Sequence, residues 1–352
     1  QPGILAGAAE KNITPPVGLD IMHPHRLNAG VHDPLFLRVL VLKDRSGTSV
    51  ALITADLICG GFVAMDELRN RVKAKTGVNE VWLNTSHAHS SRWLRASPEP
   101  EHPWTNEMIW DEYHPHRLNE NPEEAKWNKM VHEAAVTTVM EAKKKLIPVQ
   151  LHAGRAPVQV GFNRRITDSS GWTRMGVNRK GPVVPWVNVL MAKNLENGRP
   201  IAILFEHPAH PVTVPPFNKL VSADFPGAAV AHIRQGLGQD VIAMYGQGCC
   251  GNINSFPLRS SMEDARVAGE KLGQATLQAA RESKPISATS ITLRSRRIHL
   301  PTRALPDPET VKDLKQKNKG HPARMRQLEK ISALQESMDT PPPRRFDLYG
   351  IL

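Results

Sequence analysis

The sequence contains 352 residues, of which 40% are hydrophobic and 22% are charged, so it is neither a disordered chain nor one with a membrane-spanning run. Its formal net charge of +11 favours anionic partners, although much of the excess is concentrated in the basic segment 311–330. The 24 glycines and 29 prolines predict an enzyme rich in turns and loops. Three cysteines cannot form a disulfide framework, and the neighbours Cys249 and Cys250 are poorly placed to pair with each other.

The chain begins at Gln1 without a methionine, which is typical of a mature N-terminus and predicts a secreted or periplasmic protein. A first hairpin is predicted where LRVLVLK and SVALITA flank the turn residues 44–47. A helix should follow with Asn121 as its cap and Pro122 at its first position. A second hairpin is predicted where VNVLMAK and PIAILFE flank Asn197 and Gly198.

The last third of the chain again alternates between predicted helices and predicted strands. Ser260 and Glu263 form a capping-box pattern before a helix that should end near Glu282, and TSITLRSRRIHL then reads as a strand. Residues 306–338 are helical in pattern with a break at 320–322, and FDLYGIL opens a strand that we expect to continue beyond Leu352. The predicted class is α/β with mixed β-sheets flanked by helices. The predicted domains are 1–300, a basic helical segment 301–345, and the strand start 346–352.

Two histidine motifs follow predicted strands. In VWLNTSHAHSS, continued extension would place His87 and His89 on the same face about 7 Å apart. The pair could then bind one metal ion together, or one histidine could bind it while the other does acid–base work. In FEHPAHPVTV, a strand runs into His207 and His210, and the prolines on both sides of His210 restrict its direction as a metal ligand requires.

Two further segments could complete a site. Asp224 in SADFPG could orient a histidine or cap the next helix. In MYGQGCCGNIN, a strand leads into a turn with glycines at 246, 248 and 251, whose N–H groups could form an oxyanion hole or an anion nest. Cys249 is a weaker candidate nucleophile, because adjacent cysteines after a strand are more often packed in a core.

An insert at 92–121 is dense in aromatic residues and histidines, and the hexapeptide HPHRLN occurs both at 23–28 and at 114–119. We predict that these segments line the mouth of the pocket, with exposed turns as the alternative for the two repeats. The predicted substrate-binding residues are His23, His25, Trp93, His114, His116 and Asp224.

The order of several motifs resembles the catalytic N-terminal domain of the neutral, non-lysosomal ceramidase family, and the chain looks like a divergent bacterial-type member. The matching segments, in family order from Ala6 to Asn254, are AGAAEKNITPPVG, VHDPLFLRVLVL, ITADL, NTSHAHSS, GFNRR, PAHPVTV, SADFPG and GQGCCGNIN. The resemblance implies an α/β domain that holds zinc and hydrolyses the amide of N-acylsphingosine. It implies zinc ligation by His87 and His210, with His89 close by and Arg164 in contact with the site.

The chain departs from this family at two places. The family completes its zinc shell with a glutamate and a tyrosine that follow the strand matching FDLYGIL, and the sequence ends at Leu352 before either. In the glycine-rich turn, Gly248 stands where the family carries a serine implicated in substrate handling, and Asn252 replaces an aspartate. The arrangement that recognises ceramide is therefore not preserved.

The predicted function is zinc-dependent hydrolysis of an amide in a small-molecule or lipid-like N-acyl substrate, which need not be ceramide. Zinc held by His87 and His210 would activate a water, His89 would carry the proton, and Arg164 with the N–H groups of Gly248 and Gly251 would stabilise the oxyanion. An anionic membrane surface is a further expected contact, whereas no recognised motif points to nucleic acid. The alternatives are a metal hydrolase of an ester or glycan-linked group, and a non-catalytic binding protein for an anionic lipid or glycan.

Overall fold

The computed structural model describes residues 3–21, 26–95, 122–169, 171–301, 304–337 and 344–351. Contacts divide these residues into two units, one that ends at Thr292 and a second that begins at Leu293. In the part of the chain so described, no helix combines the length and the apolar character needed to cross a membrane. The candidate site belongs to the first unit.

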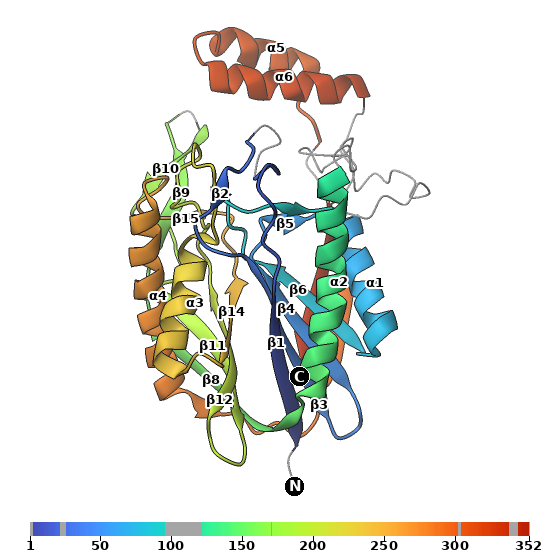
Figure 1. Ribbon diagram of the computed structural model, residues 1–352. Coiled ribbons are helices and arrows are strands. Elements are labelled where there is room, and N and C mark those ends of the chain that lie inside the picture. Colours follow the sequence, from blue (N-terminus) through green and yellow to red (C-terminus); the bar gives the residue numbers. More distant parts are fainter. Residues whose placement is uncertain are drawn as a thin grey trace. The chain divides into compact units, whose positions relative to one another are not determined.

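A nine-stranded mixed sheet organises the first unit (Figure 1). Eight strands lie in the order β14 (Ile242–Gln247), β12 (Pro200–His207), β11 (Trp186–Asn194), β8 (Ile147–Pro157), β1 (Ile4–Asn12), β3 (Phe36–Asp44), β4 (Ser49–Ala55) and β6 (Glu80–Thr85), and β16 (Lys284–Pro285) also pairs with β8. Both predicted hairpins are confirmed, since β3 pairs with β4 and β11 with β12 in antiparallel fashion. The α/β class with a mixed sheet is confirmed as well.

The two ends of this sheet are parallel pairs, each connected through a helix. Helix α1 (Phe62–Thr76) connects β4 to the parallel strand β6, and α3 (Asp224–Leu237) connects β12 to the parallel strand β14. Such crossovers bring the carboxyl ends of both strands of a pair to the same edge, where the loops can carry functional residues. The loops with His87 and His210 leave the sheet at these ends.

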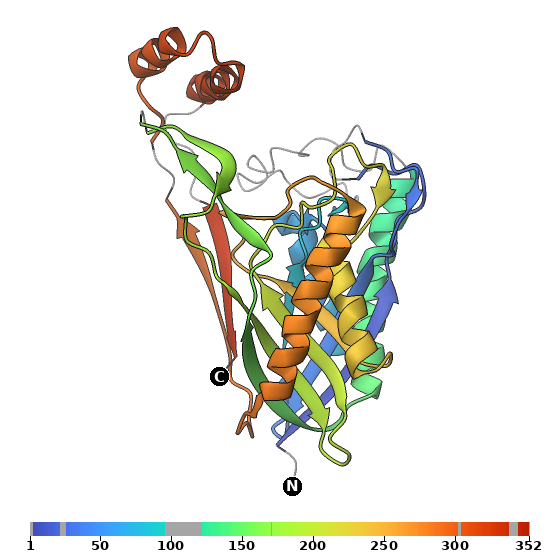
Figure 2. The ribbon, with the colours of Figure 1, turned by 90° about the vertical axis from the view of Figure 1, so that its left-hand side faces the viewer.

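Helices cover the sheet in two pairs. Figure 1 shows α1 beside α2 (Pro122–Lys144) and, on the other side, α3 beside α4 (Met262–Glu282), which Figure 2 shows in front of the sheet. Pro122 opens α2 as predicted, whereas Asn121 lies outside the described residues. The predicted cap of α4 is wrong by one position, because the hydroxyl of Ser261, not Ser260, accepts the Asp264 N–H.

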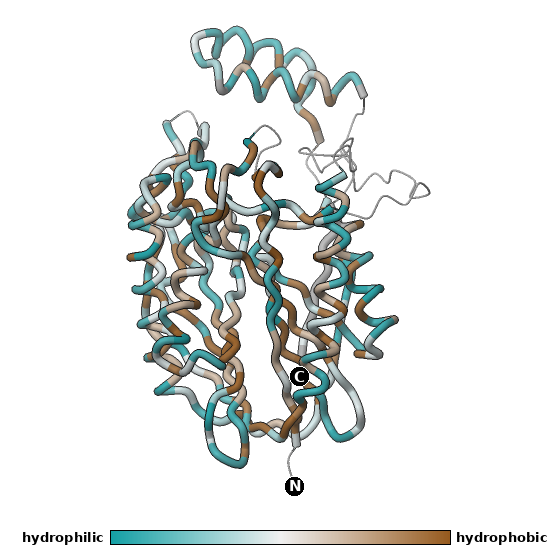
Figure 3. The backbone as a smooth tube through the Cα atoms, viewed as in Figure 1, coloured by the Kyte–Doolittle hydropathy of each residue, from teal (hydrophilic) through white to brown (hydrophobic). Residues whose placement is uncertain are grey.

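Each helix pair encloses its own hydrophobic cluster. The first cluster contains Leu37, Val39, Ile53, Val81 and Trp127 among others, all at most 3% exposed. The second, around Phe205, Phe225, Ile233, Tyr245 and Leu272, lies between α3, α4 and the strands from β8 to β14. In Figure 3 the strands are predominantly hydrophobic, and hydrophilic residues are frequent on the helices that cover them. Burial on this scale is the main stabilising contribution to the unit.

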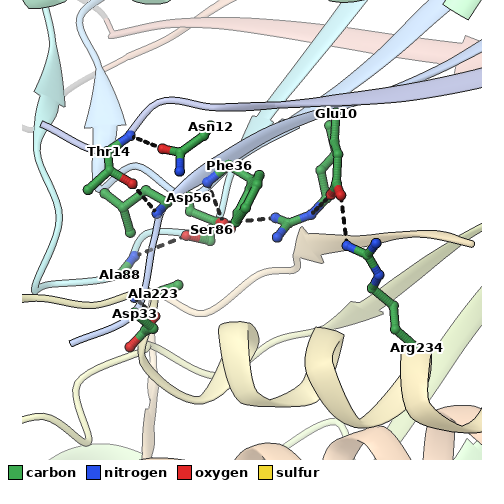
Figure 4. Close-up of polar contacts among 12 residues, drawn as sticks. Glu10, Asn12, Thr14, Asp33, Phe36, Asp56, Ser86, Ala88, Ala223 and Arg234 are labelled. Atoms are coloured by element: carbon green, nitrogen blue, oxygen red, sulfur yellow. Dashed lines mark hydrogen bonds and ion pairs between the residues drawn. The ribbon is translucent and has the colours of Figure 1, made fainter. Parts of the chain in front are cut away.

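A buried ion network ties the first strands to α3 (Figure 4). The guanidinium of Arg38, 4% exposed, lies 2.8 Å from Asp56 Oδ2 and 3.3 Å from Glu10 Oε2. Glu10 also pairs with Arg234 of α3 at 2.7 Å, and Asp56 accepts the backbone N–H of Phe36. Asp56 follows β4 directly, so the network fixes the start of the loop that leads toward the site.

Three small sheets lie beside the main one in the first unit. They are β9 (Gly161–Thr167) with β10 (Thr173–Asn178) and β15 (Ile253–Ser255), β2 (Gly30–Val31) with β13 (Leu220–Val221), and β5 (Cys59–Gly60) with β7 (Trp93–Leu94).

In its described residues, the second unit contains one antiparallel strand pair and two helices that lie between these strands in the sequence. Strand β17 (Leu293–Leu300) pairs with β18 (Arg344–Ile351), and α5 (Pro308–Lys317) precedes α6 (Pro322–Ser337). The predicted helical break at 320–322 is confirmed, and Asp307 caps α5 by accepting the N–H of Thr310. The predicted domain boundaries at 300 and 345 stay predictions.

Candidate metal site

Three histidines from the two parallel ends of the sheet converge on one point. His87, His89 and His210 each direct a ring nitrogen to within 4.8 Å of the other two. Their ring centroids are 4.8 to 5.8 Å apart. In the described chain no carboxylate or thiol is within 4.8 Å of all three, although the Cys250 sulfur is close to His210. The structure therefore brings together the two predicted ligands and the predicted proton carrier.

His87 reaches the cluster by a turn. Strand β6 ends at Thr85, and His87 has a left-handed backbone with φ +64°. The expectation that extended geometry continues through His89 is wrong, because the loop folds onto the segment after β4. The His87 N–H donates to Leu57 O, and the His87 Nδ1–H donates to Ile58 O at 2.7 Å. A non-glycine residue in this conformation is unfavourable and persists where its surroundings enforce it, often at functional sites.

His210 is held by the glycine-rich turn. Its side chain is buried, its Nδ1–H donates to Cys250 O at 2.7 Å, and its backbone N–H donates to Ile253 O. His207, the other histidine of this motif, is not part of the cluster, since its ring bonds to Trp186 O. With Nδ1 committed to backbone carbonyls, His87 and His210 each direct Nε2 toward the cluster, which is the orientation of most metal-binding histidines, and the Cys250 sulfur is 3.9 Å from Nε2 of His210.

His89 has a ring nitrogen without a partner. Its Nε2 is buried and receives no hydrogen bond from any described residue, while its backbone N–H donates to Pro211 O and its carbonyl accepts Arg26 Nη2. A buried polar atom without a partner is uncommon and calls for an explanation, such as an ion. Three neutral imidazoles, two of them oriented by carbonyls, form a donor set that fits zinc.

The electrostatics of the cluster keep all three rings neutral. Burial is the largest cause of a lowered pKa in each ring: the pKa of His87 is lowered, that of His210 is lowered to about 4, and that of His89 is lowered to about 2. The charges of the neighbouring histidines, of Arg259 and of Arg164 contribute to the pKa of His89. Since a metal competes with protons for ring nitrogens, neutral rings are ready to bind it.

Arg164 lies close to the cluster, since its charge lowers the pKa of all three histidines. It is on β9, its Nε donates to Gly251 O at 3.1 Å, and its Nη1 donates to Asn254 Oδ1 at 3.2 Å. Asn254, which is 6% exposed and bridges to His210 through the backbone, was not among the predicted site residues. Its signal in the sequence was a polar residue just after the glycine-rich turn.

The glycine-rich turn itself is tightly wound. The Cys250 N–H donates to Gly248 O at 2.8 Å, and a Cβ on Gly248 would collide with Glu206 and Pro208. A Cβ on Gly251 would meet nothing within 4 Å. Cys249 is exposed, and burial raises the pKa of the Cys250 thiol, whose sulfur lies 3.9 Å from His210 Nε2. Cys250 therefore lacks the lowered pKa of an activated nucleophile.

Asp224 accepts hydrogen bonds from the backbone of its own surroundings. Its carboxylate, buried at the first residue of α3, accepts the backbone N–H groups of Val214 and Phe225, while the cap position is Ala223. Burial and the nearby Asp33 raise its pKa to about 6. It also lines an open groove of about 680 Å³ between α3 and the first strands. Its hydrogen bonds hold the loop after His210, so the substrate-binding role predicted for it stays a prediction.

Of the remaining predicted substrate-binding residues, Trp93 lies within the described part of the chain. Trp93 is half-buried on β7, which pairs with β5. The four predicted histidines of the repeats, His23, His25, His114 and His116, lie outside the described residues.

The fold is that of the neutral ceramidases, as the motifs predicted. A solved neutral ceramidase from Pseudomonas aeruginosa matches with a TM-score of 0.66 and 17% identity, over 89% of this chain and 50% of its own. A ceramidase complexed with C2 matches with a TM-score of 0.67 and 19% identity, over 89% of this chain and 49% of its own. The chain thus spans about half the length of both. No protein-family model and no curated protein matches the sequence.

Proposed function

We propose that this chain belongs to a zinc-dependent hydrolase of an N-acyl amide, whose substrate need not be ceramide. The observation that carries the proposal is the convergence of His87, His89 and His210 at the ends of two parallel strand pairs, on a fold shared with the neutral ceramidases. One of the solved neighbours is a ceramidase complexed with C2, which supports a lipid-like N-acyl substrate. Fold alone does not fix the reaction, so the site residues bear the argument.

In this proposal His87 and His210 hold the ion through Nε2. The carbonyls of Ile58 and Cys250 fix the tautomer and direction of both rings. When bound, zinc supplies a water nucleophile near neutral pH, because it lowers the pKa of that water from about 15.7 to about 7.

Arg164 and the glycine-rich turn would stabilise the charge that develops on the amide oxygen. Arg164 is oriented by two hydrogen bonds, to Gly251 O and Asn254 Oδ1, so its guanidinium needs little reorganisation during the reaction. The backbone N–H groups of Gly248 and Gly251 remain the proposed additional donors.

We assign His89 a third-ligand role beside the predicted role of proton carrier. A proton carrier works best with a pKa near the operating pH, whereas the pKa of His89 is about 2. The unpartnered Nε2 in the same cluster supports ligation. Three protein ligands and one open position form the usual arrangement of a catalytic zinc.

Two expectations accompany the proposal. Export to the periplasm or medium, and contact with an anionic membrane surface, would bring the site to lipid-like substrates. Hydrolysis of an ester or glycan-linked group would use the same residues, and turnover of matched amide and ester substrates separates these reactions.

The test is elemental analysis of zinc after dialysis against a mild chelator, together with hydrolysis of an N-octanoyl amide. We expect about one zinc per chain, and loss of both metal and turnover in the His87→Ala, His210→Ala double variant. His299→Ala, an exposed histidine of the second unit, is the matched control and should keep both. A parent protein that binds zinc but cleaves neither amide nor ester would favour the non-catalytic alternative. Absence of bound zinc would refute the proposal.

A further inference from the structure

Three arginines from separate segments surround the histidine cluster. Arg26 Nη2 donates to His89 O at 3.1 Å, Arg164 donates to Asn254, and Arg259 lies close enough to His89 to lower its pKa. None of the three forms an ion pair with a carboxylate of the described chain, although the structure contains many such pairs elsewhere. The surroundings of the cluster are therefore strongly positive.

Two of these arginines line one small cleft with His89. The remaining walls of the cleft are apolar and consist of Val212, Val214, Pro215 and Pro216. Low-dielectric walls strengthen the field of the two guanidinium groups, because less water screens them. The cleft has a volume of about 10 Å³, which is room for about one water or one oxygen atom of an anionic group, and its border with His89 places that oxygen next to the reacting centre.

Arg259 is held in place at an energetic cost. Its backbone is left-handed, with φ +52°. Two backbone hydrogen bonds fix this conformation: the Arg259 N–H donates to Val212 O at 2.9 Å, and the Ser260 N–H donates to Thr213 O at 2.7 Å. Its guanidinium is exposed and forms no hydrogen bond with a described residue, so it supplies the free N–H donors of the cleft. The guanidinium of Arg26 adds positive charge: its Nη1 and Nη2 donate to Pro216 O and His89 O, and its Nε is buried without a partner. Strain in a charged residue that has no internal partner points to an external one.

We infer that the Arg26–Arg259 cleft is an anion subsite that binds a carboxylate close to the scissile amide, so that the substrates are N-acyl amino acids in preference to neutral N-acyl amines. The inference rests on the proposed function and names its substrate class. Arginine matches a carboxylate well, since its planar fork of N–H donors can form charge-assisted hydrogen bonds to both oxygens. In an N-acyl amino acid the carboxylate is three bonds from the amide carbonyl carbon, which suits a subsite that borders His89.

The binding test uses the full metal-free chain and two probes that differ only in the terminal group, a carboxylate in N-octanoylglycine and a neutral amide of similar size in N-octanoylglycinamide, in equilibrium dialysis. We expect at least tenfold tighter binding of N-octanoylglycine, and an affinity ratio below threefold in Arg259→Gln. Arg259→Gly, which suits the left-handed backbone, should lose the preference too. Arg199→Gln, at the exposed turn before β12, is the matched charge control and should keep it. Equal affinity of the parent for both probes would overturn the inference, whatever the variants do.

Turnover separates this inference from the proposed function. Zinc-loaded protein should hydrolyse N-octanoylglycine with kcat/KM at least tenfold above that for the glycinamide, and Arg259→Gln should remove this ratio while zinc per chain stays unchanged. If neither amide is cleaved but the binding preference holds, the hydrolase proposal fails and the anion subsite stands. If the glycinamide is cleaved equally well, the hydrolase stands and the subsite fails.

Discussion

The side chain of Asn84, at the end of β6, forms two hydrogen bonds with the backbone of Gln247, at the end of β14. Its Nδ2 donates to Gln247 O at 3.1 Å, and its Oδ1 accepts the Gln247 N–H at 2.8 Å, although the residues are 163 positions apart. One amide side chain thus imitates the pairing of a strand and connects the two ends of the nine-stranded sheet. His87 follows Asn84 by three residues, and the turn that holds His210 follows Gln247.

Asn84→Ala should loosen this connection. We expect a loss of about 1–3 kcal/mol in the free energy of unfolding, because the Gln247 backbone groups lose their partners. Zinc affinity should fall by about 10- to 100-fold, as for other changes in groups that support metal ligands. Urea unfolding and competition with a chromophoric chelator measure the two effects. Asn197→Ala, in the exposed turn before β12, loses a bond from the Arg199 N–H, so it should lower stability by less and leave zinc affinity unchanged.

His89→Ala separates the two roles considered for His89. A third ligand predicts that zinc affinity falls by at least about 100-fold, since a direct bond to the metal should count for more than a supporting contact. The measurement is the zinc dissociation constant at pH 7.5, with His299→Ala as control. Unchanged affinity together with lost turnover would instead support the role of proton carrier.

Asp224 should make stability depend on pH. Its pKa is raised from 3.8 to about 6 in the folded protein, so between these values the folded state binds more protons than the unfolded state and stability falls as pH rises. The ionised, buried carboxylate then costs about 2–3 kcal/mol above pH 6. Asp224→Asn, which tolerates the left-handed backbone at φ +56°, removes this titration.

Urea unfolding of both proteins at pH 4, 5, 6 and 7.5 measures the effect. The free energy of unfolding of the parent, relative to the asparagine variant, should decline between pH 4 and pH 6 and then stay constant. A difference that does not change with pH would show that Asp224 titrates normally.

Asp56→Ala should be strongly destabilising, because it leaves the buried Arg38 guanidinium with Glu10 as its remaining carboxylate. Removal of one partner from a buried ion pair costs about 3–5 kcal/mol. Lys126→Ala breaks an exposed i,i+3 pair with Glu123 and should have a much smaller effect. Thermal and urea unfolding of the two variants provide the comparison, and similar losses would contradict the buried network.

The hairpins, most helices and the two principal histidines were predictable because local signals decide them. Asn197 and Gly198 specify a tight turn between two apolar strands, and Pro122 suits the first turn of a helix. The break before α6 follows from Gly320 and Pro322 for the same kind of reason.

The geometry of the site was less predictable, since it depends on contacts between distant segments. The left-handed turn at His87 forms because Leu57 and Ile58 offer carbonyls to it, and no pattern around His87 announces this. The pairing of Asn84 with Gln247 and the position of Asn254 likewise depend on how the sheet ends meet. The extended His-x-His expectation failed because local alternation was weaker than this tertiary closure.

The division of the first unit into two hydrophobic clusters has a consequence for its dynamics. His87 follows a strand of the first cluster, and His210 follows a strand of the second. Such clusters can behave as separate cooperative opening units, each with its own free energy of opening. An ion bound by both histidines would require both clusters to be closed. With the ion bound, the two clusters would therefore open together in one event. Hydrogen exchange of the β6 and β14 amides would then slow together when the metal is added.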